Sequence, residues 1–391
     1  MKDTKEDFCR HLCRLGFEIG ASREWVQQKF RRHIGDERFA AFERIAQGLR
    51  GGTNDDPLYD FVQDNIEANL LRSIDPDVTV DTSYHLYQWC RPLLKAGTRV
   101  LELACWTGGL TSFIAVNHPQ SQVAGVDRVE RVIGLNRAQH QLPNLTFQSW
   151  DYRHEKPAEV ESADVLICGL GINNLPDGGY EDAKTKGLRA SAGYQRHKAD
   201  AAIYFRNWRS AAKPGATLLA VLRMNSFGRY MAYVDAACEA GWTPELSSWM
   251  MVTIPTAKQA IPALRFVARE AALLPEDHLL TNFVRLMTPG SPYAQLVDGL
   301  ALAVYQGLTN RKVLRVVNYH GQNGVPTCSD EIGVAGSFGY IFWTNGAPQY
   351  RLSLISAVEA ESRAAQWQPG QQSQITYSLP SGAQMTTRVA G

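Results

Sequence analysis

The sequence lacks any hydrophobic run that approaches the roughly 18 residues a helix needs to cross a bilayer. Its first residues, MKDTKEDFCRHLCR, are charged and do not contain the apolar stretch of a signal peptide. It also lacks an excess of either charge, because 40 basic and 39 acidic side chains leave a formal net charge of +1. A surface that binds duplex nucleic acid normally carries a strong basic excess, which disfavours a nucleic-acid partner. We therefore expect a cytoplasmic protein that does not contact a membrane.

Cysteines are few and irregularly spaced, at positions 9, 13, 90, 105, 168, 238 and 328. An odd number at such spacing does not predict a disulfide framework. Cys9 and Cys13 would face the same side of a helix, but no nearby His or Cys pair completes a tetrahedral metal site. We therefore predict no bound metal, and thiols that stay reduced in a reducing compartment.

The length of 391 residues exceeds what one core usually serves, so several structural units are expected. Residues 1–74 repeat apolar side chains at helical spacing, which predicts an N-terminal helical unit that acts as a cap or a dimer contact. Residues 75–272 alternate short β-rich runs with helical stretches, which predicts βαβ units around a mostly parallel sheet. Residues 273–391 indicate a helix and a small antiparallel β unit, a candidate substrate or dimerisation region.

Individual elements are predicted from the same periodicities. The predicted helices include residues 58–72, 226–240 and 292–308. The predicted strands of the middle region are 99–104, 122–126, 145–148, 164–168 and 217–222, followed by a pair at 247–254 and 263–269 that a loop near 255–262 joins. The predicted strands of the last region are 313–319, 338–343, 350–358, 374–379 and 384–389.

The most informative stretch is VLELACWTGGL at residues 100–110, where a buried strand ends, a turn of mostly small residues follows and a helix begins. A ligand at such a turn lies close to backbone N–H groups and to the positive end of the helix. The next strand ends in Asp127, nineteen residues after Gly108. An acid at the tip of that strand can accept hydrogen bonds from both hydroxyls of a ribose. The two features predict a nucleoside-containing ligand at the carboxyl edge of an α/β sheet.

The composition of the turn disfavours a dinucleotide as this ligand. A dinucleotide fingerprint reads G-x-G-x-x-G, because its glycines let the backbone approach the pyrophosphate. Here only Gly108 and Gly109 are present, and Trp106 stands where a phosphate would need space. A ligand without phosphates, such as S-adenosylmethionine, fits the crowded turn better.

The same stretch resembles motif I of the class I S-adenosylmethionine-dependent methyltransferases, which is usually written D/E-x-G-x-G-x-G. Glu102 matches the acid and Gly108 the third glycine, whereas Ala104 and Trp106 replace the first two glycines. Further resemblances follow in chain order: Asp127 to the ribose-binding acid, Trp150-Asp151-Tyr152 to the third motif, residues 164–170 to the fourth strand and residues 213–218 to the turn before the fifth. The resemblance implies a seven-stranded Rossmann-like α/β sheet whose last strand is reversed.

The resemblance also implies that the chain binds S-adenosyl-L-methionine. Trp106 departs most from the family, and its ring could stack on the cofactor, turn outward as a lid or fill the cofactor site. The residues expected to bind the cofactor are Glu102, Ala104, Cys105, Trp106, Gly108, Asp127, Arg128, Asp151, Tyr152, Cys168 and Gly169.

In the family, the substrate side is built from the loop after the fourth strand and from helices before motif I. This places His85, His197, Tyr180 and Tyr194 as candidate catalytic residues. His85 is either a base or an aromatic wall over the methyl group, or it lies on the polar face of a helix that packs on the sheet. The other three lie in a long segment after the fourth strand, where they either reach the acceptor or stay exposed in a loop.

We therefore expect an enzyme that methylates a small-molecule acceptor by in-line displacement from the sulfonium. Aromatic side chains before motif I and in the long segment favour a pocket that encloses a modest substrate. Three alternatives stay open: a protein or peptide methyltransferase that docks through its flanking units, a non-catalytic module that binds S-adenosylmethionine, and aminopropyl or similar transfer on the same scaffold. A homodimer is also open.

Overall fold

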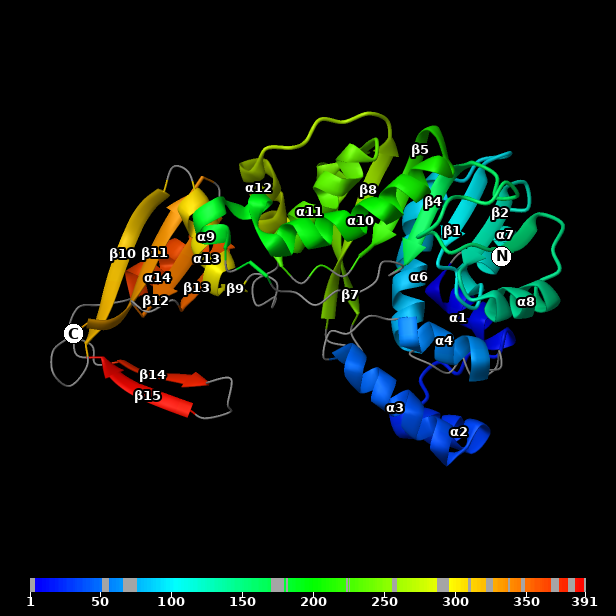
Figure 1. Ribbon diagram of the computed structural model, residues 1–391, viewed down its shortest axis with the longest axis horizontal. Helices are drawn as coiled ribbons and strands as arrows, with labels where there is room; N and C mark the ends of the chain where they lie inside the picture. Colours follow the sequence, from blue (N-terminus) through cyan, green and yellow to red (C-terminus); the bar gives the residue numbers. More distant parts are fainter. Residues whose placement is uncertain are drawn as a thin grey trace. The chain divides into compact units, whose positions relative to one another are not determined.

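The structure is a computed structural model of the chain (Figure 1). It forms two compact units, one made of Met1–Asp177, His197–Met224 and Ala232–Leu273, the other of Gly178–Arg196, Asn225–Met231 and Leu274–Gly391. The division of the chain at residues 74/75 and 272/273 stays a prediction. The structure describes residues 4–50, 56–65, 76–169, 179–180, 182–222, 224, 226–254, 259–286, 295–308, 311–320, 326–336, 338–345, 349–366, 373–378 and 384–389.

A central sheet of eight strands organises the first unit, in the order β3-β2-β1-β4-β5-β8-β6, with β7 also paired to β8. The first five strands in this order are parallel, and β8 runs antiparallel to β5. This confirms the predicted Rossmann-like sheet with a reversed strand beside the fifth, and adds one strand to the seven expected. The strands are β1 (Arg99–Leu103), β2 (Gln122–Asp127), β3 (Leu145–Ser149), β4 (Ala163–Gly169), β5 (Ala212–Val221), β6 (Trp242–Pro244), β7 (Met250–Ile254) and β8 (Gln259–Ala268).

The end of the sheet differs from the prediction in two places. The short strand β6 was not predicted, because three residues carry no readable alternation. β8 begins inside the segment predicted as a loop, and includes Pro262. Proline lacks an N–H donor, but its carbonyl still pairs: the carbonyl oxygen of Pro262 accepts a hydrogen bond of 3.1 Å from the Leu222 N–H.

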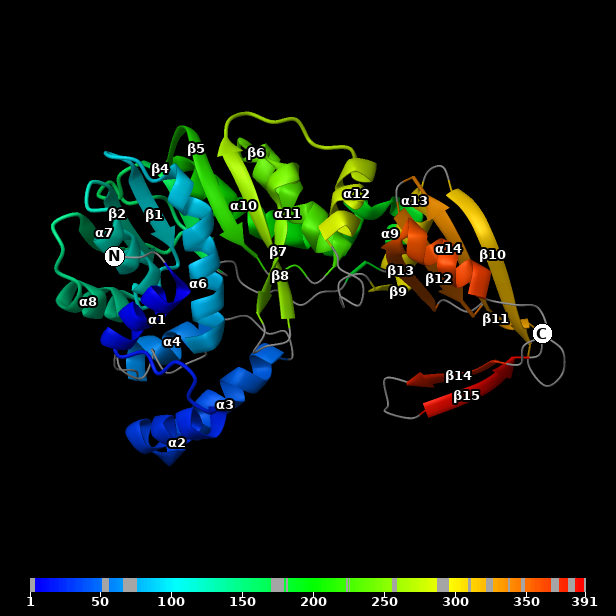
Figure 2. The same ribbon diagram turned by 180° about the vertical axis from the view of Figure 1, so that it is seen from behind.

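Helices cover both faces of this sheet, α10 and α11 on one face and α6 on the other (Figures 1 and 2). The residues facing the sheet are apolar, and they form a core that includes Phe113, Ile114 and Ile167, all fully buried. The helices are α6 (Pro76–Cys90), α7 (Gly109–Asn117), α8 (Glu130–Gln139), α10 (Ala192–Ser210) and α11 (Phe227–Glu239), with short 3₁₀ turns η1 (Arg91–Leu93), η2 (Leu188–Ala190) and η3 (Leu246–Ser248).

The N-terminal helices pack on this α/β core within the same compact unit. α1 buries Phe8 and Leu12 completely in the main core. α2, α3 and α4 form a second apolar cluster together with Val129 and Val132 of the α8 region. The predicted helix over 58–72 is observed as α4 up to residue 65, and the next ten residues lie outside the described part of the chain. The bounds are α1 (Lys5–Arg14), α2 (Arg23–Ile34), α3 (Asp36–Arg50) and α4 (Asp56–Asn65).

The second unit contains a five-stranded antiparallel sheet, ordered β10-β11-β12-β13-β9, and a separate hairpin of β14 and β15. The antiparallel unit was predicted, but β11 was missed because its sequence PTCSDEIGVA is interrupted by polar residues and glycine. A helix was predicted over 292–308, of which residues 295–308 are described, and there the chain forms a strand followed by a helix; α14 was not predicted. The bounds are α9 (Ala183–Lys186), α12 (Glu276–Leu286), β9 (Gln295–Val297), α13 (Asp298–Gly307), β10 (Arg311–His320), β11 (Pro326–Ala335), β12 (Phe338–Thr344), β13 (Tyr350–Ser356), α14 (Ala357–Gln366), β14 (Ser373–Ser378) and β15 (Gln384–Val389).

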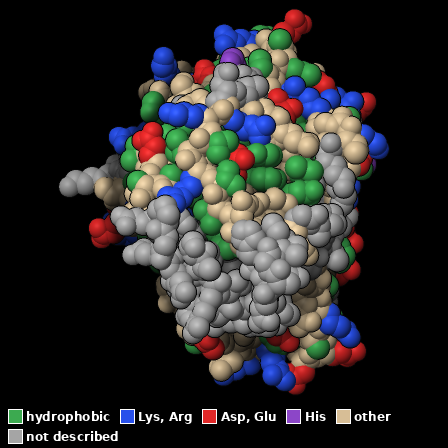
Figure 3. Space-filling model, turned by 90° about the vertical axis from the view of Figure 1, so that its left-hand side faces the viewer, with side chains coloured by type: hydrophobic (Ala, Val, Ile, Leu, Met, Phe, Trp, Pro, Cys, Tyr) green, Lys and Arg blue, Asp and Glu red, His purple; other side chains and the backbone are tan. Residues whose placement is uncertain are grey.

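Several valines of the second unit remain exposed, among them Val313 and Val316 of β10 at 47% and 52%. Figure 3 likewise shows hydrophobic side chains interspersed with Lys and Arg on the face that it draws. Scattered exposed valines are normal on a protein surface and mark no site by themselves. Among the helices that the structure describes, none combines the length and apolar character that spanning a bilayer requires.

Candidate functional site

The turn after β1 has an unusual backbone at three alternate positions. Ala104, Trp106 and Gly108 have φ angles of 55°, 47° and 69°, in the left-handed region that favours glycine. These are the three positions at which the methyltransferase motif has its glycines. The turn therefore keeps a glycine-type path although two of its glycines are replaced, and the strain this causes is typical of binding sites.

The third of these positions also has no room for a side chain. A Cβ atom added to Gly108 would lie 2.7 Å from the Phe147 ring, and one added to Gly125 would lie 3.0 Å from the Cys105 sulfur. The Asn136 side chain donates a hydrogen bond of 2.6 Å to the carbonyl oxygen of Trp106. Close packing between strands, turn and α8 therefore fixes the path of the turn.

Asp127, at the end of β2, is buried and accepts backbone hydrogen bonds with both carboxylate oxygens. Oδ2 accepts from the Trp106 N–H and Oδ1 from the Val129 N–H, both at 3.0 Å. Burial raises the pKa of this carboxyl, and the two backbone hydrogen bonds oppose that shift. Asp127 thus connects the turn, β2 and the start of α8.

Glu102, the acid of the motif, lies within β1 and is also buried. The Thr111 hydroxyl of α7 donates a hydrogen bond to its Oε2 atom. Burial raises the pKa of Glu102 to about 8, an effect that this hydrogen bond opposes and the charge of Asp127 increases. Near neutral pH the free protein therefore holds Glu102 mostly protonated, and a cation beside it would favour the ionised form.

A cavity of about 190 Å³ opens at this edge of the sheet, and we call it the sheet-edge cavity. The only charged side chains that line it are Glu102 and Asp127, and its lining includes no Lys, Arg or His among the residues that the structure describes. The rest of the lining is uncharged, and comes from α1, α4, α6, the turn, the start of α7, the β3–β4 connection and the end of β4: Phe8, Leu12, Tyr59, Thr82, Ser83, Leu86, Ala104, Cys105, Trp106, Thr107, Gly109, Leu110, Tyr152 and Gly169.

The Trp106 ring forms part of the cavity wall and packs toward the N-terminal helices. It meets the Tyr59 ring of α4 edge to face, with ring centroids 6.3 Å apart, and contacts the apolar cluster of α2, α3 and α4. Its side chain is half-buried. The indole is therefore held against α4 rather than projecting freely into solvent.

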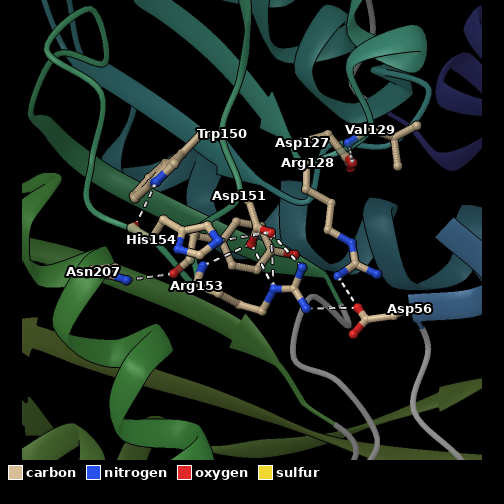
Figure 4. Close-up of polar contacts among 10 residues, drawn as sticks. Asp56, Asp127, Arg128, Val129, Trp150, Asp151, Arg153, His154 and Asn207 are labelled. Atoms are coloured by element: carbon tan, nitrogen blue, oxygen red, sulfur yellow. Dashed lines mark hydrogen bonds and ion pairs between the residues drawn. The ribbon is translucent and has the colours of Figure 1, made fainter. Parts of the chain in front are cut away.

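Two predicted cofactor residues, Arg128 and Asp151, are engaged in ion pairs beside the cavity (Figure 4). Asp56 of α4 accepts hydrogen bonds from Arg128 at 2.5 Å and from Arg153 at 2.8 Å. Arg153 in turn binds both carboxylate oxygens of Asp151, the shortest contact being 2.6 Å. The Arg128 guanidinium also lies 3.7 Å from the centre of the Tyr59 ring. This network holds α4 beside the cavity.

Seven of the eleven predicted cofactor residues line the sheet-edge cavity, and the other four do not: Gly108, Arg128, Asp151 and Cys168. Gly108 shapes the turn, and Cys168 is buried within β4 beside Gly169, which does line the cavity. The binding role of each residue stays a prediction. Tyr59 and Thr82 were not predicted, because nothing local in a helix sequence tells which distant surface the helix will face.

The four candidate catalytic residues do not line this cavity. His85 lies on α6, whose cavity-facing residues are Thr82, Ser83 and Leu86, and burial lowers the pKa of His85. The segment predicted as a loop after the fourth strand is helical from residue 192, so His197 is a buried residue of α10 instead of a loop residue. Tyr180 and Tyr194 are likewise buried, and both belong to the second unit. Their catalytic roles stay predictions.

Comparisons with known proteins give short but consistent similarities. No protein-family model matches the chain. It is 34% identical over 83 residues to a malonyl-[acyl-carrier protein] O-methyltransferase of Bacillus cereus, which covers 20% of this chain and 30% of that protein. It is 32% identical over 89 residues to a demethylmenaquinone methyltransferase of Lactobacillus johnsonii, covering 22% and 36%. The chain thus spans about a third of the length of the curated relatives it matches.

Comparison with solved structures gives matches of low similarity, two of which are methyltransferases. A putative sarcosine dimethylglycine methyltransferase from Galdieria sulphuraria has 12% identity and a TM-score of 0.35, over 49% of this chain and 87% of that one. A mutant 16S rRNA (adenine(1408)-N(1))-methyltransferase with cosubstrate SAM, from Catenulisporales acidiphilia, has 19% identity and a TM-score of 0.32, over 48% and 92%. The strand order and the glycine-type turn after β1 give the first unit a Rossmann-like fold, and the two curated relatives that it matches over short stretches are methyltransferases.

Proposed function

We propose that the chain binds S-adenosylmethionine in the sheet-edge cavity and transfers its methyl group to a small-molecule acceptor. The observation that carries the proposal is the acidic lining of the cavity, which has the carboxyl groups of Asp127 and Glu102 and no basic side chain among the described residues. A cation that binds beside Glu102 favours the ionised form of this carboxyl. A sulfonium and an ammonium group are attracted to such a cavity, whereas the phosphates of a nucleotide would be repelled. The aromatic wall adds favourable contacts for a cationic ligand and for a purine ring.

In this proposal Asp127 accepts hydrogen bonds from the ribose hydroxyls. A carboxylate has about four acceptor positions, so the two backbone N–H groups already bound leave capacity for a ligand. Glu102 lies one strand further along the sheet and faces the positive groups of the same ligand. The backbone of the turn between them supplies N–H groups for close approach.

S-adenosylmethionine supplies a methyl group on a sulfonium: the bond from sulfur to methyl breaks as the bond from the acceptor to methyl forms. The protein's part is to align the acceptor with this group and to keep water away, and alignment alone can supply much of the rate. An acceptor that starts protonated also has to lose its proton. None of the four candidate catalytic residues lines the described cavity, and the carboxyl groups that do line it are Glu102 and Asp127.

A small-molecule acceptor is supported by the enclosure of the cavity. Helices α1, α4 and α6 contribute Phe8, Tyr59 and Leu86 to its walls, so that the ligand lies between helices and sheet edge instead of on an open surface. A protein or peptide acceptor would have to extend a side chain between these helices. Cytoplasmic location and a homodimer stay predictions from the sequence.

Isothermal titration with S-adenosylmethionine and S-adenosylhomocysteine tests the binding half of the proposal. We expect the wild-type chain to bind both, and Asp127→Ala to weaken both. The matched control is Asp164→Ala, because Asp164 is the second residue of the parallel strand β4, at the opposite edge of the sheet, and pairs with Lys213 at 2.8 Å. If neither compound binds, or if Asp127→Ala binds as tightly as wild type, the proposal is wrong.

Methyl transfer is tested with methyl-labelled S-adenosylmethionine and a cell extract. We expect label to enter the small-molecule fraction in the presence of the wild-type chain and to stay at background with Asp127→Ala. Label in the macromolecular fraction would instead support a protein or peptide methyltransferase. Binding of the cofactor without transfer of label to any fraction would support a non-catalytic binding module.

A further inference from the structure

One hydroxyl group in the wall of the sheet-edge cavity is buried without a hydrogen-bond partner. Thr82 lies on α6, its side chain lines the cavity, and the residue is only 4% exposed. Its Oγ1 atom has no hydrogen-bond partner among the residues that the structure describes. A threonine hydroxyl inside a helix commonly donates to the carbonyl oxygen four residues earlier. The Thr82 hydroxyl does not form this bond, so it can donate to another group.

A buried hydroxyl with no partner costs stability, because it has lost its water without gaining a replacement. A valine of the same shape would avoid this cost in the free protein. A buried threonine without a partner is therefore expected where a bound ligand accepts or donates the missing hydrogen bond. Such a ligand would lie in the sheet-edge cavity, which Thr82 lines.

The position of Thr82 tells which end of the ligand it faces. Its Cγ2 atom lies 3.9 Å from a Cβ added to Gly169, at the carboxyl end of β4. Asp127 ends β2, and β1 separates the two strands in the sheet. With neighbouring strands about 4.8 Å apart, Asp127 and Gly169 lie roughly 10 Å apart across the cavity. Thr82 thus faces the end opposite the proposed ribose contact.

We propose that the Thr82 hydroxyl donates a hydrogen bond to the carboxylate of the amino-acid end of the ligand. This rests on the proposed function, with the ribose at Asp127 at the end of β2, the adenine on the β3 side of it and the amino-acid end on the β4 side. The described lining of the cavity contains no Lys, Arg or His, so a carboxylate in it depends on hydroxyl and backbone N–H donors. Among these, the Thr82 hydroxyl combines burial with an unused hydrogen-bonding capacity.

The test compares two ligands that differ only at this end: S-adenosylhomocysteine, and 5′-methylthioadenosine, which has no amino acid. We expect Thr82→Val to weaken S-adenosylhomocysteine roughly tenfold, the loss of one hydrogen bond to a charged group. Its affinity for 5′-methylthioadenosine, measured by displacement of bound S-adenosylhomocysteine, should not change. Thr82→Ser keeps the hydroxyl and should bind S-adenosylhomocysteine as wild type does.

Two further measurements separate this role from a structural one. The melting temperature of the free Thr82→Val protein should stay the same or rise, since the substitution removes an unpaired buried hydroxyl. Asp127→Asn, at the ribose end, should weaken both ligands. Unchanged binding of S-adenosylhomocysteine to Thr82→Val, or equal weakening of both ligands, would overturn the inference. Failure of the wild-type chain to bind either ligand would instead refute the proposed function itself.

Discussion

The backbone N–H of Trp106 donates a hydrogen bond of 3.0 Å to the Oδ2 atom of Asp127. The turn after the first strand is thereby fastened to the tip of the second, and the other oxygen of the same carboxylate receives the N–H of Val129. One buried side chain therefore shapes the turn and also faces the cavity. Substitution of Asp127 should affect folding and ligand binding together.

Asp127→Asn keeps the size of the side chain but replaces one acceptor oxygen by an NH₂ group. One backbone N–H then faces a donor inside the protein, so we expect a loss of roughly 2 kcal/mol in the free energy of unfolding, measured with urea. Asp164→Asn is the control: its ion pair with Lys213 is more than a third exposed, and the asparagine oxygen can still accept the Arg99 N–H, so stability should change little. Equal losses for the two variants would contradict this account of Asp127.

Glycine at the first left-handed position of the turn should stabilise the protein. Ala104→Gly removes the strain of a side chain at φ 55°, and we expect a net gain of about 0.5–1 kcal/mol after the entropy cost of glycine. Gly108→Ala should do the opposite, because it adds a methyl group at φ 69° against the Phe147 ring. Gly134→Ala, on α8 with open space around it, controls for ordinary helix propensity. Urea unfolding of the three variants measures these signs.

Glu102 should make the protein less stable as the pH rises. Burial raises its pKa from 4.5 to about 8, so between these values the folded state holds a proton that the unfolded state has lost. The free energy of unfolding then falls with increasing pH through this window. Glu102→Gln cannot titrate, so its stability should vary less across the same window in urea titrations. A wild-type profile that stays parallel to that of Glu102→Gln would show that Glu102 ionises normally.

His11 should make the protein less stable as the pH falls. Burial lowers its pKa from 6.5 to about 4, and its Nε2 atom lies 2.9 Å from the Ser112 hydroxyl. Between pH 6.5 and 4 the unfolded state binds a proton that the folded state does not, so stability is lost as the pH falls. His11→Gln can keep the hydrogen bond and should lose less stability on acidification.

The ion pairs of Asp56 should hold α4 in place beside the cavity. Asp56→Asn removes the charge that Arg128 and Arg153 share, so we expect faster hydrogen exchange of the α4 amides. Asp60→Asn removes an equal charge from an exposed position on the same helix and should leave exchange unchanged. The same exchange rates in both variants would mean that apolar packing alone holds α4.

The sequence alone was enough to predict the α/β sheet and the two acids at its edge. Apolar β-rich runs of a few residues, separated by helical stretches, leave a parallel sheet as the compact arrangement, and β1, β2, β3 and β4 lie within one or two residues of their predicted bounds. Asp127 was found because its position follows from where a strand ends, which is local information, and Glu102 was found through the resemblance to motif I. β11 and α14 were missed because their local patterns are mixed.

Only the tertiary structure decided what surrounds those acids. The helical spacing of Phe8 and Leu12 predicts that one face of α1 is buried, but it does not say against which surface. Packing of α1, α4 and α6 on the sheet brings Tyr59 and Thr82, distant in the chain, to the edge where Asp127 lies. The direction of the Trp106 ring was open for the same reason, since apolar contacts with α4 determine it and those contacts are long-range.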